Sequence, residues 1–164
     1  MRGQDRDQEF RNFYFAEAPR LRRLALMMTG SEDRAEDLTQ DALLNAYRKW
    51  GRIRNEDPGP YVRKILVNLI RNQYRRRMLE LRKQERPLRA VGSHDERVDD
   101  ALTVAQALTV LSPIRRAAIV LRFYEDMPEE EIARTLDRPL NTVKSDIRRA
   151  LEKLRPALEE GVAT

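Results

Sequence analysis

The feature that most constrains this chain is the spacing of its apolar residues, which recur every three or four positions almost throughout. No stretch alternates apolar and polar residues as a half-buried strand does, and glycine and proline are sparse. A period near 3.6 is typical of helices that bury one face. The sequence therefore predicts an all-α protein. A length of 164 residues suits one ordinary domain or two small ones.

Composition excludes several kinds of chemistry. The chain has no cysteine and a single histidine, His94, so disulfides, thiolate catalysis and cysteine-ligated zinc are excluded. A histidine metal site or a Ser-His-Asp triad is not expected either, and we expect no metal and no cofactor. No apolar run approaches the ~20 residues that span a bilayer, and the first ten residues lack the apolar core of a signal peptide. We therefore expect no membrane insertion.

The net charge of +5 conceals two blocks of opposite sign. Residues 31–41 contain five acids and one base, and residues 61–90 contain ten bases and two acids. Surfaces that need charge only for solubility intersperse the two signs. The blocks therefore indicate two partners, one basic and one acidic. The alternative is that both are solvated helix faces.

Apolar spacing and punctuation place the helices of the first half. We expect one helix over 8–29, kinked or divided at Pro19, and another from 32 to about 50 with Ser31 as its N-cap. A loop over 51–59 follows, and Pro60 then suits the first position of a helix that runs beyond 77. Its predicted buried stripe is Val62, Ile65, Leu66, Leu69 and Ile70.

The helical pattern is lost over 80–98, which contains proline, glycine and a polar run. We therefore predict two small helical domains, 1–79 and 99–164, joined by a flexible linker over 80–98. In the second domain, helices are expected over 101–111, from Pro113 after a Ser112 cap, over 128–136 and over about 141–155.

The last two helices and the turn at 137–140 form a predicted helix-turn-helix. An inner stripe comprises Val143, Ile147, Ala150, Leu151 and Leu154, and the polar residues Thr142, Lys144, Ser145, Arg148, Arg149 and Glu152 lie outside it. An apolar anchor behind hydrogen-bonding side chains is the layout that a helix needs to read the DNA major groove. The alternative is a helical hairpin that only packs.

Two further faces suggest binding. Lys64, Asn68, Arg71 and Arg75 stack along one side of their helix, where cations can neutralise phosphates and the amide can contact a base edge. The nearby aromatic residues Trp50, Tyr61 and Tyr74 either stack on unpaired bases or belong to the core.

The second face is acidic and carries Asp33, Asp37, Gln40 and Asp41 around Leu44. An apolar residue ringed by carboxylates is typical of a protein-docking surface. A di-iron site would need Glu-x-x-His pairs, which this helix lacks.

Three motifs in order carry a resemblance to a known family. SEDRAEDLTQDALLNAYRKW resembles the polymerase-binding helix of bacterial sigma factors, and PYVRKILVNLIRNQYRRR resembles their −10-recognising helix. The run from LSPIRRAAIVLRF to NTVKSDIRRALEKLR is similar to their −35-recognising domain. Order and spacing match the extracytoplasmic-function (ECF) class of the sigma-70 family, over roughly residues 8–157.

The resemblance implies a role for each face. The acidic face, Asp33, Asp37, Gln40, Asp41 and Leu44, would dock on the clamp helices of the polymerase β′ subunit. The loop 51–59, with Arg54 and Asn55, would capture a flipped −10 base, and Lys64, Asn68, Arg71 and Arg75 would meet −10 DNA. Residues assigned to the −35 groove are Asn141, Thr142, Lys144, Ser145, Arg148 and Arg149.

The resemblance also implies a non-enzymatic function: binding core RNA polymerase, through β′ and the β flap, and directing it to promoter DNA in the cytoplasm. An anti-sigma factor is a further expected partner. Rival interpretations are a stand-alone helix-turn-helix regulator and a metal-dependent nuclease using Glu36, Asp37 and Asp41. The chain departs from the family at Asn141, expected here as an N-cap, at Pro128, and at Asp146, which either tunes base choice or faces a neighbouring base.

Overall fold

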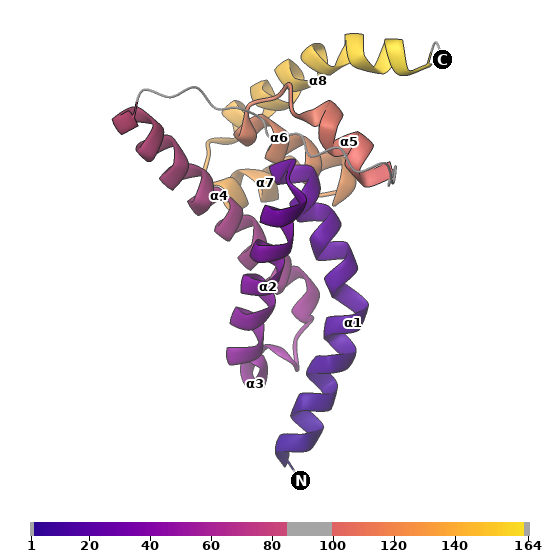
Figure 1. The fold of residues 1–164 in the computed structure, drawn as a ribbon, viewed down its shortest axis with the longest axis vertical. Helices are drawn as coiled ribbons and strands as arrows, with labels where there is room; N and C mark the ends of the chain where they lie inside the picture. The colour runs from indigo at the N-terminus through magenta and orange to yellow at the C-terminus, as the bar shows by residue number, and fades with distance from the viewer. Residues whose placement is uncertain (1, 85–99, 163–164) are drawn as a thin grey trace.

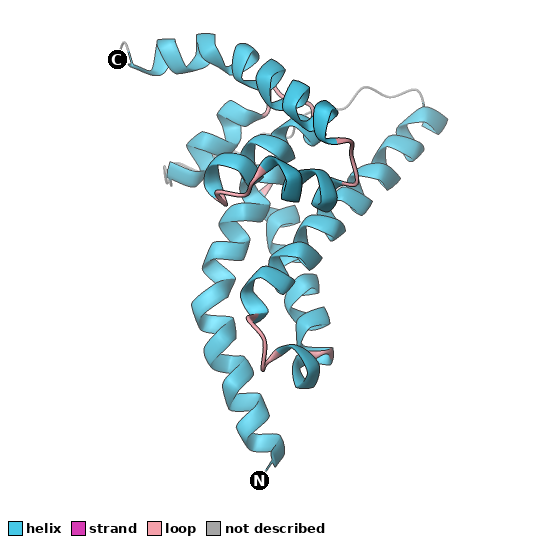
Figure 2. Cartoon of the chain, turned by 180° about the vertical axis from the view of Figure 1, so that it is seen from behind, coloured by secondary structure: helices cyan, strands magenta, loops and turns pink. Residues whose placement is uncertain are grey.

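The computed structural model describes residues 2–84 and 100–162, and all the regular structure within them is helical (Figure 1, Figure 2). The prediction of an all-α fold is confirmed. The elements are α1 Arg2–Thr29, α2 Glu32–Arg48, α3 Trp50–Ile53, α4 Pro58–Gln84, α5 Asp100–Leu108, α6 Pro113–Ile119, the π-helical turn η1 Val120–Tyr124, α7 Glu129–Leu136 and α8 Leu140–Val162. In this part of the chain, no helix combines the length and apolar character that crossing a membrane requires.

The junction of α1 and α2 follows from three residues. Pro19 lies inside α1, which continues through it as one helix, so a second helix does not begin there. Gly30 ends α1 with a left-handed φ of 67°, a conformation that costs glycine little. Ser31 then caps α2, as predicted, because its side chain accepts a hydrogen bond from the Arg34 backbone N–H.

The predicted loop over 51–59 is shorter in the structure. Trp50 and Ile53 are both buried, and the turn that joins them forms the short helix α3. Helix α4 already begins at Pro58, so Pro60 is not its first residue. The loop is reduced to 54–57. At its far end α4 extends to Gln84, so residues 80–84 are helical, and the rest of the predicted linker lies outside the described residues.

Two details of the second half differ from expectation. Helix α5 ends at Leu108, before the expected end at Leu111. Ser112 does precede a helix that starts at Pro113, but its side chain makes no capping hydrogen bond.

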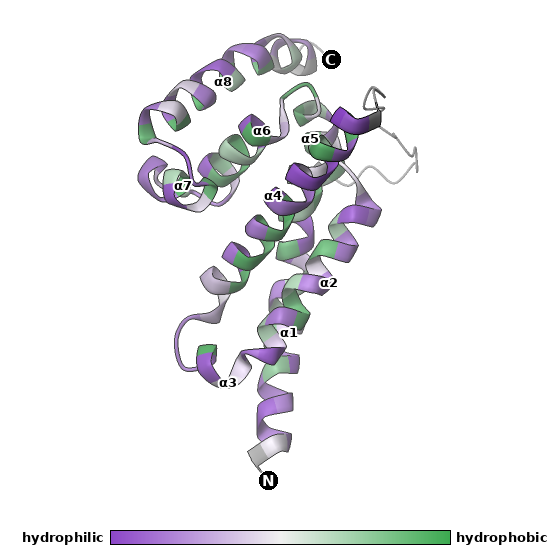
Figure 3. Cartoon of the chain, turned by 90° about the vertical axis from the view of Figure 1, so that its left-hand side faces the viewer, coloured by the Kyte–Doolittle hydropathy of each residue, from purple (hydrophilic) through white to green (hydrophobic). Residues whose placement is uncertain are grey.

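The two halves of the chain share a continuous apolar core. Helix α1 packs on α2 and α4 and also on α5 and α6, while α4 contacts α7 (Figure 1). Apolar side chains of α1 around Leu24 and Met28 are buried where these elements meet. Hydrophobic colour lies on the inner sides of the helices and hydrophilic colour on their outer sides (Figure 3). The charged side chains therefore lie on the outer faces of the helices, where a partner can reach them.

Candidate nucleic-acid and protein interfaces

The acidic face of α2 is exposed to solvent. The opposite side of the helix, from Ala35 to Ala46, is buried and fixes its rotation. The exposed side chains are Asp33, Asp37, Gln40, Asp41 and Leu44. Leu44, one turn from Gln40 and Asp41, is 49% exposed and adds an apolar side chain to this polar surface. The structure thus places all five predicted residues on one surface.

The single base of the acidic block, Arg34, turns away from this face. Its Nε donates a hydrogen bond of 3.0 Å to the Gln73 side chain on α4. Burial, followed by the charges of Arg77 and Arg116, lowers the pKa of Arg34 to about 10. The exposed part of the block is therefore more uniformly acidic than the sequence sum indicates.

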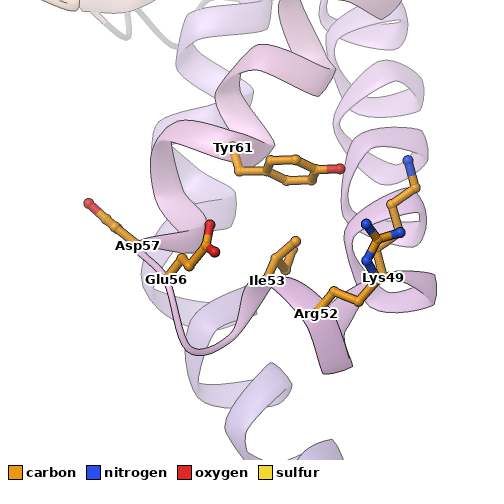
Figure 4. A pocket seen from close by; sticks show the side chains of 6 residues that line it. All are labelled: Lys49, Arg52, Ile53, Glu56, Asp57 and Tyr61. Atoms are coloured by element: carbon orange, nitrogen blue, oxygen red, sulfur yellow. The ribbon is translucent and has the colours of Figure 1, made fainter.

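A pocket of about 200 Å³ lies where α3 leads into α4 (Figure 4). Its lining residues are Lys49, Arg52, Ile53, Glu56, Asp57 and Tyr61. The Tyr61 ring lies above Ile53, with Arg52 and Glu56 near opposite sides, and Asp57 points away (Figure 4). An aromatic surface with charged groups at its edges can stack on a planar base and hydrogen-bond to it.

The two loop residues predicted for −10 contact do not line this pocket. Arg54 Nη1 lies 3.0 Å from the Glu9 carboxylate on α1, and Asn55 is exposed beside it. Trp50 belongs to the core, with its ring against Phe10, whereas Tyr61 stays 39% exposed. The charged residues at the edges of the pocket, such as Arg52 and Glu56, were not predicted, because only the folded loop brings them together.

The basic face of α4 is divided in two. Lys64 and Arg75 are exposed, as predicted, and Asn68 is half-buried. Arg71 is engaged within the protein: its Nη1 donates to the Thr135 carbonyl at 3.3 Å, and its side chain is 18% exposed. The face that the sequence predicts is present, but one of its four members already has a partner.

Helix α8 presents a polar outer face. Exposed members are Asn141, Lys144, Arg148 and Arg149, and half-buried ones are Thr142 and Ser145. The predicted inner stripe is buried except at Leu151, which is 42% exposed and lies at the edge of the packed surface. Because α8 starts at Leu140, Asn141 lies inside the helix and is not its N-cap.

The turn between α7 and α8 is held by backbone geometry. Asp137 adopts a left-handed conformation with φ of 53°, and the Arg138 N–H donates to the Ala133 carbonyl at 2.9 Å. This closes the end of α7 and directs the chain into α8. Helix α7 packs on α8 and η1, and α8 packs on α6, which completes the helix-turn-helix.

For Asp146, the structure favours the second of the two interpretations given above, that its carboxylate faces neighbouring basic side chains. It is only 8% exposed and faces inward, 3.3 Å from Arg115 Nε and 3.8 Å from Arg138 Nε. Both partners are arginine side chains of the same domain, so Asp146 holds α6 and the turn before α8 against α8. Sequence reasoning also missed Arg116, a buried arginine that donates to three backbone carbonyls.

Comparisons with known proteins identify the two halves. Residues 13–79 match the model of sigma-70 region 2, and residues 101–154 match that of sigma-70 region 4. The chain is 33% identical to RNA polymerase sigma-E factor of Streptomyces avermitilis, over 92% of this chain and 86% of that protein. It is 31% identical to ECF RNA polymerase sigma factor SigL of Mycobacterium tuberculosis, over 92% of this chain and 89% of that protein.

The fold is also similar to a solved structure. The sigma factor RpoE of Bartonella quintana, crystallised with the anti-sigma factor NepR, superposes with a TM-score of 0.73 and 27% identity. The alignment covers 93% of this chain and 98% of that one. Regions 2 and 4 in this order, with ECF relatives matched over nearly their whole length, show that the chain belongs to the ECF class of the sigma-70 family.

Proposed function

We propose that this chain binds core RNA polymerase through the acidic face of α2 and promoter DNA through the basic faces of α4 and α8. As an ECF sigma factor it directs transcription initiation with RNA polymerase and catalyses no reaction itself. The assignment of faces rests on one observation: acidic and basic residues lie on separate helices, each exposed above a buried apolar stripe.

The acidic face is the proposed contact to the β′ clamp helices. Asp33, Asp37 and Asp41 lie outside the salt bridges found among the described residues, so their charges are available to a basic partner. Leu44 supplies the apolar centre of the contact. Charge complementarity around an apolar residue favours a specific, oriented complex.

The proposed −10 surface consists of Lys64, Asn68, Arg71 and Arg75 on α4 together with the pocket beside Tyr61. Cations would hold the DNA backbone, and the pocket would hold an unpaired base by stacking, at about 1–3 kcal/mol per base. Arg54 and Asn55 would contribute from the rim of the loop. The proposed −35 surface is the exposed side of α8, with Thr142 and Ser145 near its N-terminal end.

In this proposal residues 1–79 carry polymerase and −10 binding, residues 99–164 carry −35 binding and the β-flap contact, and 80–98 connects them. An anti-sigma factor is a further proposed partner, because the RpoE relative was solved in complex with NepR. An apolar groove lined by Met27, Val104 and Phe123 offers a surface for such a protein. We place the protein in the cytoplasm, with the polymerase it serves.

The experiment that tests the assignment reverses one charge. Asp37→Arg should weaken binding to purified core polymerase about tenfold or more, because it puts a cation where a basic partner docks. Asp5→Arg, an equal reversal at an exposed position of α1, should bind as the wild type does. Both variants should keep the wild-type free energy of unfolding within about 0.5 kcal/mol. Unchanged affinity of Asp37→Arg would remove the acidic face from the interface.

A stand-alone helix-turn-helix regulator, the rival interpretation of the sequence, would have no use for a polymerase-binding domain. The match of residues 13–79 to sigma-70 region 2, ahead of region 4, sets that interpretation aside.

A further inference from the structure

The first turns of α1 hold the segment that lines the pocket beside Tyr61. We refer to residues 5–10 as the N-terminal brace. The match to sigma-70 region 2 begins at residue 13, so the brace precedes it. Helix α1 packs on α2 and α3 (Figure 3). The brace therefore belongs to this chain's own structure around the pocket, and its contacts show what it holds in place.

Three residues of the brace fix the end of α2. Arg6 Nη2 donates a hydrogen bond of 3.1 Å to the Tyr47 carbonyl, and its guanidinium carbon lies 5.6 Å from the centre of the Tyr47 ring. The Tyr47 hydroxyl donates to Asp7 Oδ1 at 2.9 Å. The Phe10 ring packs edge-on against the rings of Tyr47 and Trp50, at centroid distances of 5.0 and 5.1 Å. The end of α2 and the start of α3 are therefore attached to α1.

The brace also reaches the loop 54–57, through one ion pair. Arg54 Nη1 donates to Glu9 Oε2 at 3.0 Å. Arg54 keeps helical backbone angles, and its N–H donates to the Trp50 carbonyl at 3.0 Å, so the turn of α3 continues to this residue. The two side chains of the ion pair are 36% and 50% exposed, so replacing either of them leaves the buried core untouched.

Arg54 lies on the side of this turn that faces away from the pocket. Two positions along a helix correspond to about 200° of rotation, so Arg52 points the opposite way from Arg54 and lines the pocket (Figure 4). Glu56, two residues after Arg54, lines the pocket as well. Holding Arg54 against α1 therefore sets the orientation in which Arg52 and Glu56 face a base that lies on the Tyr61 ring.

We propose that Glu9 is a positioning residue for the pocket: by holding Arg54 from α1, it orients the turn that presents Arg52 and Glu56 to a captured base. This inference rests on the proposed function of the pocket as a base site. Stacking on an aromatic ring accepts all four bases, whereas choosing among them requires hydrogen-bonding groups at fixed places around the base. Glu9 therefore acts on the choice of base more than on the strength of binding.

The test measures base selection by the full chain in complex with core RNA polymerase. The probe is single-stranded DNA with six randomised positions between constant ends, and the bound molecules are sequenced. Tyr61→Ala identifies the position that the pocket reads, because selection at that position is lost with the ring. The quantity compared is the base preference there, the ratio of the favoured base to the mean of the other three.

Glu9→Ala should lower this preference about threefold, in keeping with the strength of an exposed ion pair, and leave the other five positions as in the wild type. Glu9→Gln keeps an oxygen that can accept from Arg54 and should retain about half of the preference that Glu9→Ala loses. The matched control is Asp5→Ala, which removes the same charge from an exposed position one turn earlier on the same side of α1. It should select bases as the wild type does.

A double substitution tests whether Glu9 acts through Arg54. Arg54→Ala should lower the base preference at least as much as Glu9→Ala does. Adding Glu9→Ala to Arg54→Ala should change nothing further, because the group through which Glu9 acts is then absent. Losses that multiply in the double variant would overturn the route through Arg54. The urea midpoint of unfolding should be that of the wild type for all these variants.

The outcomes separate this inference from the function on which it rests. Wild-type selection by Glu9→Ala, at a position where Tyr61→Ala has lost it, overturns the positioning role and leaves the pocket as the base site. Selection that Tyr61→Ala leaves unchanged at every position overturns the proposed base site, and the inference with it. Weaker selection by Glu9→Ala at all six positions, with a lower urea midpoint, also overturns the inference, because the fold is then what Glu9 supports.

Discussion

The acidic face of α2 and the ion pairs that Glu125 forms between the halves, with Arg20 and Arg63, use charged residues in opposite ways. On α2, three aspartates project into water and make none of the salt bridges found in the described residues. Where the two halves meet, the charged groups of Arg116 and Glu125 are buried and have partners. An exposed charge that has no ion pair is available to a partner, whereas a buried one stabilises the fold. Mutations can separate these two uses by their effect on unfolding.

The largest effect on stability is expected at Arg116, which is 8% exposed. Its guanidinium donates to the carbonyls of Leu108, Leu111 and Met28, so it joins α5 and α6 to the end of α1. Arg116→Met should lower the free energy of unfolding by about 3 kcal/mol, because three buried acceptors lose a charged donor. Urea denaturation followed by circular dichroism measures this loss.

The control for that experiment is Arg134→Met, an exposed arginine on α7. It should change the free energy of unfolding by less than about 0.5 kcal/mol. Equal losses in the two variants would contradict the distinction between buried and available charges.

An intermediate effect is expected at Asp146, which is paired with Arg115 and Arg138. Asp146→Asn should lower the free energy of unfolding by about 2 kcal/mol, since two partly buried arginines lose their counter-charge. Selection of −35 sequences from a randomised duplex library should give the wild-type consensus. An altered consensus at constant stability would show instead that Asp146 reads a base.

The smallest effect on stability is expected at Arg149, three positions further along the same helix and exposed. Arg149→Ala should leave the free energy of unfolding within about 0.5 kcal/mol of wild type. Affinity of the polymerase complex for a −35 duplex should fall about tenfold if Arg149 contacts a base edge. Lys153→Ala, one turn beyond, serves as the exposed control. Equal affinities for all three proteins would place the recognition surface elsewhere.

Local signals in the sequence were sufficient for much of the fold. The period of the apolar residues predicted the helices, Ser31 marked a helix start, and the acidic residues of α2 were assigned to one face. These features depend on residues within one or two turns of each other, which a single chain displays directly. The same holds for the helix-turn-helix, whose inner stripe is buried at four of five predicted positions.

Long-range pairing could not be predicted in this way. Nothing local distinguishes Arg71, which is engaged by α7, from the exposed Arg75 on the same helix. Asp146 likewise follows a run of outward-facing polar residues, yet its partners lie on α6 and in the turn. The loop residues at the pocket came together only because α3 formed a turn that buries Trp50 and Ile53. In each case the partners lie on other elements or are brought together by a turn, which the spacing of apolar residues does not show.

The π-helical turn η1 makes the contact between the halves tolerant of a change in chain length. A π turn closes over five residues, as the hydrogen bond from the Glu125 N–H to the Val120 carbonyl shows, and so holds one residue more than an α turn. Because the wider turn takes up the extra residue, the two kinds of turn cover nearly the same rotation about the helix axis. Deleting a single residue from 120–124 would therefore restore α geometry and keep Glu125 facing Arg63. In this segment the residue count can fall by one without changing how the two halves meet.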